Sequence, residues 1–237
     1  MQALVTGGAQ GIGLEIAESL IRDGYNVSIF DTNEQKLKQV ATKLNCKVFE
    51  IDISQESQVK EAIGGLESLD VLVNNAGIWR PELLENLDIP TQRSVWETNV
   101  LGTLICSKYA LSIMKYSNSS SIINLTSAAS RTNSPGLGLY AASKSAIEAL
   151  TRQWSLELAP IRVNAIGPGM VITEGTAANY EGNALQHRSN AIPLRRVGST
   201  SDIAQVVSFL ASPNSSYVTG QVIFIDGGIT AGATGHN

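Results

Sequence analysis

The segment Ala3-Leu4-Val5-Thr6-Gly7-Gly8-Ala9-Gln10-Gly11-Ile12-Gly13 decides the fold class of this chain. It begins with an apolar run typical of a strand that is buried on both faces. Glycines follow at once, and apolar residues then recur at helical spacing as far as Asp23, with Gly24 placed to end the helix. The segment therefore predicts a buried strand, a glycine-rich turn and a helix N-terminus.

Such a turn suits a dinucleotide. A helix N-terminus offers free backbone N–H groups and a partial positive charge to a pyrophosphate, and glycines let the backbone come close to it. The spacing here is Gly-x-x-x-Gly-x-Gly rather than the Gly-x-Gly-x-x-Gly of the common fingerprint. Taken alone, the turn therefore also fits an ordinary strand–helix connection.

Asp31 favours the dinucleotide interpretation. It closes a second apolar run at 26–30, about 20 residues past the glycines, where an acid meets the ribose hydroxyls. The same carboxylate would repel the 2′-phosphate of NADP, and neither Gln10 nor Thr32 supplies a compensating cation, so we expect NAD as the cofactor. The alternative is that Asp31 only caps the strand end.

Strand-like and helix-like segments alternate along the whole chain, which predicts an α/β fold with a doubly wound parallel sheet and helices on both faces. No linker divides residues 1–237, so we expect a single domain. The predicted strands are 3–5, 26–30, 47–51, 70–73, 121–125, 161–165 and 221–225, and the clearest helical patterns are 12–23, 58–69, 91–114, 138–158 and 202–210.

Composition excludes several classes of function. The net charge of −4 argues against nucleic acid as a partner, and no apolar run is long enough to span a bilayer. The first strand begins within three residues of the N-terminus, which leaves no room for a signal peptide, so we expect a cytoplasmic protein. Cys46 and Cys106 are too few and too scattered for disulfides or a metal site, and we expect no metal.

Tyr140, Lys144 and Ser127 form the candidate catalytic set. Tyr140 and Lys144 are four residues apart, so in the predicted helix 138–158 they lie on one face. A phenol has a pKa near 10, and a neighbouring ammonium lowers it. Ser127 lies just past the strand 121–125, at the edge where open α/β sheets build their sites. Taken alone, Tyr140 and Lys144 also fit a helical surface pair, and Ser127 also fits a cap at a strand end.

In order and interval, these segments resemble the short-chain dehydrogenase/reductase family in its single-domain form. The resemblance implies that Tyr140 is the general acid/base, that Lys144 anchors the nicotinamide ribose and tunes Tyr140, and that Ser127 hydrogen-bonds the substrate oxygen. It implies that Asn99 completes a tetrad by holding a water in a proton path, although Asn99 also fits simple tolerance of a poor helix residue.

The resemblance also implies a set of cofactor-binding residues and a substrate lid at 173–198. Trp79, Leu137, Leu139, Met170 and Tyr180 are candidates to line an apolar substrate pocket, while His187 is more typical of a solvated residue. Besides Tyr140 and Lys144, the implied cofactor-binding residues are Gly7, Gln10, Gly11, Ile12, Gly13, Asp31, Asp52, Ile53, Asn74, Ala76, Gly77, Pro168, Gly169, Val171 and Thr173.

We therefore expect an NAD(H)-dependent oxidoreductase that interconverts a secondary alcohol and a ketone, a small-molecule carbonyl or alcohol being its partner. A 3-oxoacyl-carrier-protein reductase-like enzyme and a non-catalytic NAD-binding sensor are the alternatives. A nucleotide-sugar epimerase shares Tyr-x-x-x-Lys but usually carries a large C-terminal domain. Helical patterns 91–114 and 138–158 are apolar on more than one face, which, with the family's habit, predicts a homotetramer built as a dimer of dimers.

Overall fold

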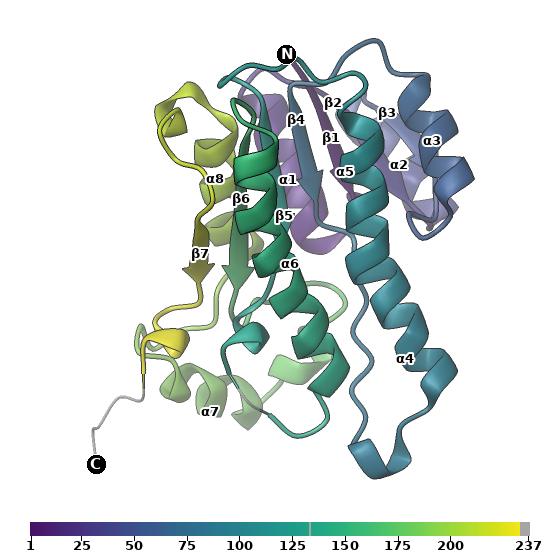
Figure 1. Ribbon diagram of the computed structural model, residues 1–237. Coiled ribbons are helices and arrows are strands. Elements are labelled where there is room, and N and C mark those ends of the chain that lie inside the picture. The colour runs from purple at the N-terminus through teal and green to yellow at the C-terminus, as the bar shows by residue number, and fades with distance from the viewer. Residues whose placement is uncertain (133, 233–237) are drawn as a thin grey trace.

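A single parallel sheet between two layers of helices makes up the molecule (Figure 1). The computed structural model describes residues 1–132 and 134–232. In this part of the chain the sheet has seven strands in the order β3-β2-β1-β4-β5-β6-β7, and every neighbouring pair is parallel. The predicted doubly wound α/β fold is confirmed. The strand order reverses between β1 and β4, and ligands of such sheets bind at the carboxyl edge of this switch point.

The strands follow the apolar runs of the sequence closely. Four of them, β1, β4, β5 and β6, are buried almost throughout, as expected for strands covered on both faces. The largest difference from prediction is at β6, which continues to Pro168. The bounds are β1 (Gln2–Thr6), β2 (Asn26–Asp31), β3 (Lys47–Glu50), β4 (Val71–Asn74), β5 (Ser121–Leu125), β6 (Arg162–Pro168) and β7 (Val222–Ile225).

Two hydrophobic clusters, one on each face, hold the helices to the sheet. The first cluster packs α1 (Gly11–Arg22), α2 (Glu34–Leu44) and α8 (Thr200–Ala211) against one face. The second packs α3 (Glu56–Gly64), α5 (Thr103–Ala110) and α6 (Gly138–Glu157) against the other. All strands end at the lower edge in Figure 1, so the loops that follow them gather there.

The predicted continuous helix over 91–114 is wrong in one respect. It is divided into α4 (Ile89–Trp96), a π-helical segment over Glu97–Gly102, and α5. Within the π-helical segment, the Asn99 side chain bonds the backbone of Ile78, and a Cβ on Gly102 would lie only 2.7 Å from the Ile53 side chain. A π-bulge of this kind commonly occurs where a helix serves a site.

The predicted lid also contains structure that its sequence does not signal. A 3₁₀ turn over Ala177–Tyr180 precedes α7 (Asn183–Ala191), which lies below the strand ends in Figure 1. None of the residues of α7 is buried, so the helix lacks the apolar period by which α1 or α8 can be recognised.

The outer faces of the two long helical segments are less apolar than predicted. Val100 and Ile147 are buried, and Leu111, Trp154 and Leu158 pack against the core. Trp96 and Leu104 remain outward, 37% and 38% exposed.

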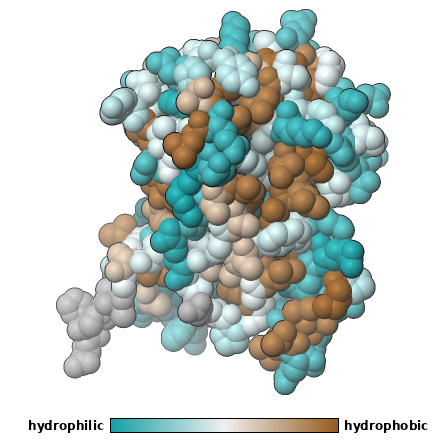
Figure 2. All heavy atoms as spheres, in the orientation of Figure 1, coloured by the Kyte–Doolittle hydropathy of each residue, from teal (hydrophilic) through white to brown (hydrophobic). Residues whose placement is uncertain are grey.

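A separate hydrophobic patch covers the connection that leads into α4 (Figure 2). Leu83, Leu84 and Ile89 are exposed there. Among the described residues, no helix is both long and apolar enough to cross a membrane. The part of the glycine-rich tail beyond Gly232, with His236, lies outside the described residues.

Candidate active site

The turn between β1 and α1 has a backbone that requires glycine. Gly7 and Gly11 have φ of +64° and +56°, in the left-handed region. A Cβ on Gly13 would lie 2.1 Å from the Gly7 carbonyl oxygen, so the turn closes directly on the helix. From the neighbouring strand end, Asn75 Nδ2 donates to the carbonyl oxygens of Thr6 and Gly7, both at 2.9 Å. These bonds fix the turn at the switch point of the sheet.

A cleft of about 470 Å³ opens at this turn and runs from the glycines to Asp31, Asp52 and Thr173. Gln10, the N-cap of α1, turns its side-chain oxygen to Lys36 Nζ and leaves the helix N-terminus to face the cleft. The cleft brings together most of the predicted cofactor-binding residues: Gly7, Gln10, Gly11, Ile12, Gly13, Asp31, Asp52, Ile53, Ala76, Gly77 and Thr173.

Asp31 lies at the rim of this cleft with its carboxylate held in place. One oxygen accepts the Ala9 N–H at 3.1 Å and the other accepts the Asn33 N–H at 3.0 Å. Two backbone donors fix the direction of the carboxylate, and the remaining lone pairs can accept hydroxyl hydrogens. The strand-end cap and the ribose contact are therefore compatible.

Asn74 occupies a different place from the one predicted. Its side chain is buried between β4 and β5, where Nδ2 donates to Asn124 Oδ1 at 2.8 Å and to Ser107 Oγ at 3.0 Å. Asn74 and Asn124 are register partners, which brings the two amides together. The side chain of Asn74 is therefore engaged inside the protein, and Asn75 lines the cleft instead.

Pro168 ends β6, Gly169 and Val171 follow it in the next loop, and none of the three is in the wall of the cleft. The Gly169 N–H donates to the Ile225 carbonyl at 3.0 Å, and Val171 is buried and paired with Gly198. These contacts set the path by which the chain reaches Thr173, which does line the cleft.

Ser127 and Tyr140 meet at the carboxyl edge of the sheet. Ser127 follows β5 and caps the short 3₁₀ turn Ala128–Ser130, where its Oγ accepts the Ala129 N–H at 3.2 Å. Tyr140 stands in the first turn of α6, and its phenol is near enough to the Ser127 side chain for Ser127 to act on the pKa of the phenol. A carbonyl oxygen placed between them would meet two hydroxyl groups.

Lys144 lies one turn further along α6 and is buried. Its Nζ donates to the Leu125 carbonyl at 2.9 Å and lies 5.8 Å from the centre of the Tyr140 ring. Gly77 leaves room for it, since a Cβ there would lie 3.3 Å from Nζ. Lys144 is thus held between Tyr140 and the cleft, as the predicted role requires.

Asn99 is buried beside Lys144, with both ends of its amide engaged. Oδ1 accepts the Ile78 N–H at 2.8 Å, while Nδ2 donates to the Ile78 carbonyl at 3.0 Å and to Ser143 Oγ at 3.1 Å. A Cβ on Gly77 would lie 3.1 Å from Asn99 Oδ1. Asn99 therefore has a specific structural function in joining the loop after β4 to α6, beyond simple tolerance in a helix.

The pKa of Tyr140 differs from our expectation. Burial raises the pKa of the phenol, and the neighbouring Ser127 side chain only partly offsets this effect. Burial also lowers the pKa of Lys144 from 10.5 to about 8. Desolvation, which disfavours the charged form of both groups, dominates over the mutual electrostatic effect that the sequence suggests.

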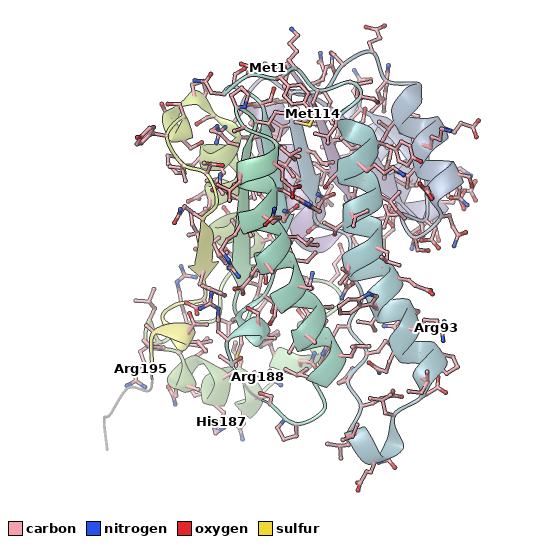
Figure 3. The ribbon with its side chains drawn as sticks, in the orientation of Figure 1. Met1, Arg93, Met114, His187, Arg188 and Arg195 are labelled. Atoms are coloured by element: carbon pink, nitrogen blue, oxygen red, sulfur yellow. The ribbon has the colours of Figure 1, made fainter. Side chains whose placement is uncertain are left out.

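The predicted apolar substrate pocket is not formed as one unit. Met170 lines a separate hollow with Pro193 and Leu194, and Trp79 is 46% exposed. Arg188 stacks on the Tyr180 ring at 5.2 Å. Figure 3 shows His187 and Arg188 together on α7, at the end of the molecule opposite Met1 and Met114. The exposed position of His187 agrees with a solvated residue.

Lys36 is a residue of the site that sequence reasoning missed. It stands near the start of α2, and its Nζ contacts Gln10 Oε1 at 2.5 Å and Glu174 Oε2 at 2.8 Å. It thereby joins the glycine turn to the first residues of the lid. Its separation from both in sequence gives no signal of this contact.

Comparisons with known proteins agree with this geometry. The family model described as enoyl-(acyl carrier protein) reductase matches residues 7–230. The 3-oxoacyl-[acyl-carrier-protein] reductase FabG of Staphylococcus aureus is 36% identical over 96% of this chain and 97% of the relative. A solved short chain dehydrogenase/reductase family protein superposes with a TM-score of 0.90 at 34% identity, covering 98% of each chain.

A second solved structure is similar over the same length. The gluconate 5-dehydrogenase of Burkholderia cenocepacia, in complex with NADP and tartrate, has a TM-score of 0.90 at 29% identity and covers 98% of this chain and 96% of its own. The glycine turn, the four polar residues at the sheet edge and these full-length similarities lead to one conclusion. This chain is an oxidoreductase that belongs to the short-chain dehydrogenase/reductase family.

Proposed function

We propose that this protein reduces the keto group of a 3-oxoacyl thioester, with NADH as the reductant. The meeting of Tyr140 with Ser127 beside buried Lys144, at the end of the cleft, carries the proposal for carbonyl chemistry. The choice of substrate is supported by the full-length similarity to the 3-oxoacyl reductase of Staphylococcus aureus. This similarity favours the alternative of our sequence analysis over a general secondary-alcohol dehydrogenase.

In this mechanism the protein orients a carbonyl and delivers a proton. Ser127 donates a hydrogen bond to the carbonyl oxygen, and Tyr140 gives that oxygen its proton. Lys144 would hold a ribose hydroxyl of the cofactor and would return a proton to the Tyr140 phenolate, its own proton being replaced from water. Asn99 fixes the loop that borders the ammonium. Proton transfer by such a group contributes about 10²–10⁴-fold to the rate. The cofactor, when bound, supplies the hydride.

The residues that would hold the cofactor follow from the walls of the cleft. The N-terminus of α1, with Gly11 and Gly13, would face the pyrophosphate, and Asp31 would face the adenosine ribose. Asp52 and Ile53 would border the adenine, and Thr173 would border the nicotinamide end. We propose NAD(H) because the carboxylate of Asp31 is fixed at the rim, while Lys36, a cation of the same rim, is engaged with Gln10 and Glu174.

A sugar-acid or polyol dehydrogenase is the second candidate. The lid favours it, because α7 consists mainly of polar residues and none of its residues is buried. The similarity to a gluconate 5-dehydrogenase is consistent with it.

A substrate panel with both cofactors separates these functions. Acetoacetyl-CoA and acetoacetyl-acyl carrier protein would be tested with NADH and NADPH, and gluconate, polyols and secondary alcohols with NAD and NADP. We expect the highest kcat/KM for a 3-oxoacyl thioester with NADH. Higher efficiency for a polyol or sugar acid would support the second candidate. If the protein binds NADH but turns over none of these substrates, the result would support a non-catalytic NAD-binding sensor.

A further inference from the structure

Glu148 is a buried carboxylate that the mechanism above does not use. It lies on α6 one turn after Lys144, and it is 4% exposed. Burial of a carboxylate is unfavourable unless it is paired and hydrogen-bonded. Arg131 supplies the pairing through two bonds to Oε2, from Nε at 3.1 Å and from Nη2 at 2.8 Å. On the other oxygen, Glu148 Oε1 accepts the Ser130 hydroxyl.

All the hydrogen-bond partners of this carboxylate come from the segment that carries Ser127. Thr126, directly before Ser127, approaches Oε1 at 3.5 Å and donates to the Lys144 carbonyl at 2.8 Å. Ser130 Oγ also lies 2.6 Å from the Ser127 carbonyl oxygen. Glu148 therefore contacts residues on both sides of Ser127 without contacting Ser127 itself.

The same cluster reaches the loop after β6. The Arg131 guanidinium lies over the ring of Phe224 on β7, 5.3 Å from its centre. That ring covers Gly167, where a Cβ would lie 2.5 Å from it, and Pro168 and Gly169 follow directly. The loop after β5 and, through Phe224, the end of β6 thus both rest against the Arg131–Glu148 ion pair.

We propose that Glu148 is a positioning residue for the reduction proposed above, and the proposal rests on that function. By holding Thr126, Ser130 and Arg131, it fixes the backbone at Ser127 so that the Ser127 hydroxyl stays directed at the Tyr140 phenol. Charge-assisted bonds to both oxygens of the carboxylate, from Arg131 on Oε2 and from Ser130 on Oε1, are well suited to this task because they are stronger than neutral ones. A displacement of about 1 Å at a reacting group can lower the rate by about 10²-fold.

The decisive variant is Glu148→Gln, which keeps the shape but removes the charge and one acceptor. The matched control is Arg152→Ala: Arg152 lies at 4.0 Å from the same carboxylate, on the exposed side, with 55% of its side chain accessible. We expect kcat of Glu148→Gln with the best substrate to fall by about 10–100-fold. KM and the Kd for NADH should change less than about threefold, and the control should match wild type.

Arg131 provides a second test that does not depend on the stability of Glu148 variants. Arg131→Ala should lower kcat as well, and Arg131→Lys should restore part of it by returning the charge. The proposal is overturned if kcat of both Glu148→Gln and Arg131→Ala stays near wild type. It is also overturned if any loss of kcat is matched by a global loss of thermal stability or by weaker NADH binding.

Amide hydrogen exchange separates failure of this proposal from failure of the proposed function. If wild type reduces none of the carbonyl substrates, the proposed function fails. Amide hydrogen exchange, measured without substrate or cofactor, then still tests whether Glu148 positions Ser127. Faster exchange in Glu148→Gln that is confined to residues 126–131 supports the positioning of Ser127. Exchange that is unchanged there, or that rises throughout the chain, overturns it.

Discussion

Asp31 should set the choice between NAD(H) and NADP(H), and its surroundings indicate the size of the effect. The carboxylate is partly exposed and fixed by the N–H groups of Ala9 and Asn33. If a 2′-phosphate were held roughly 5 Å from this carboxylate, two unit charges at that separation would repel by about 0.8 kcal/mol in bulk water and by about 3 kcal/mol at an effective dielectric constant of about 20.

Partial exposure places Asp31 toward the lower of these values, whereas a phosphate monoester carries a charge of about −1.5 to −2. We therefore expect a penalty of at least about 1.4 kcal/mol, which is a tenfold preference for NADH in kcat/KM. Since the preference is electrostatic and solvent-accessible, it should decrease as the salt concentration rises.

Steady-state kinetics with both cofactors at low and high salt test this prediction. Asp31→Asn should remove most of the preference, and Asp31→Ala with Thr32→Arg should reverse it. Glu34→Gln is the matched control, because Glu34 is a nearby exposed acid that pairs with Lys38 and does not line the cleft. Equal use of NADPH and NADH by wild type, or an unchanged ratio in Asp31→Asn, would refute the reasoning.

Three further predictions concern the tetrad and the assembly. Tyr140→Phe should lower kcat by at least about 10²-fold while the Kd for NADH, from fluorescence titration, stays near wild type; substantial remaining turnover would contradict the mechanism. Because burial lowers the pKa of Lys144 to about 8, its protonation opposes folding by about 3 kcal/mol below that pH, and this penalty disappears as pH rises toward about 10.5. Urea unfolding at pH 7 and pH 9.5 should show that gain in wild type and not in Lys144→Met; equal gains would show that Lys144 is not its source. We propose a homotetramer of 25.2 kDa chains, so light scattering should give about four times that mass. Leu104→Glu, on the outward face of α5, should reduce the measured mass. A mass of one chain for wild type would exclude the tetramer.

The fold could be predicted because its signals are local and repeated. Apolar runs such as 121–125 must be covered on both sides, and the glycine turn fixes how the first strand meets its helix. The register of β4 against β5 then follows from the burial of their apolar residues, and this register places Asn74 opposite Asn124. What the local pattern lacks is the interruption at Asn99, because the π-helical segment results from contacts with Ile78 and Ile53, which are distant in sequence.

The site could be predicted only in part, for the same physical reason. Residues at strand ends meet because parallel strands share a carboxyl edge, so Asp31, Ser127 and Gly77 fall where the pattern puts them. Side-chain direction is not contained in that pattern, and Asn74 consequently points into the sheet while Asn75 faces the cleft. Long-range contacts such as Lys36 with Glu174 depend on how the lid folds over the turn.

The pair Tyr140 and Lys144 shows why burial matters more than spacing for the chemistry. Four residues on a helix bring the two groups to one face, but burial raises the pKa of the phenol and lowers that of the amine. The protein therefore keeps Tyr140 protonated at neutral pH, which is the form that gives a proton to a carbonyl oxygen. Lys144 stays largely charged below pH 8, so its ammonium can support the phenolate that forms after the transfer. The raised pKa of Tyr140 and the lowered pKa of Lys144 together favour reduction at neutral pH. They predict that kcat/KM for reduction falls as the pH rises through about 8, because Lys144 then loses its charge.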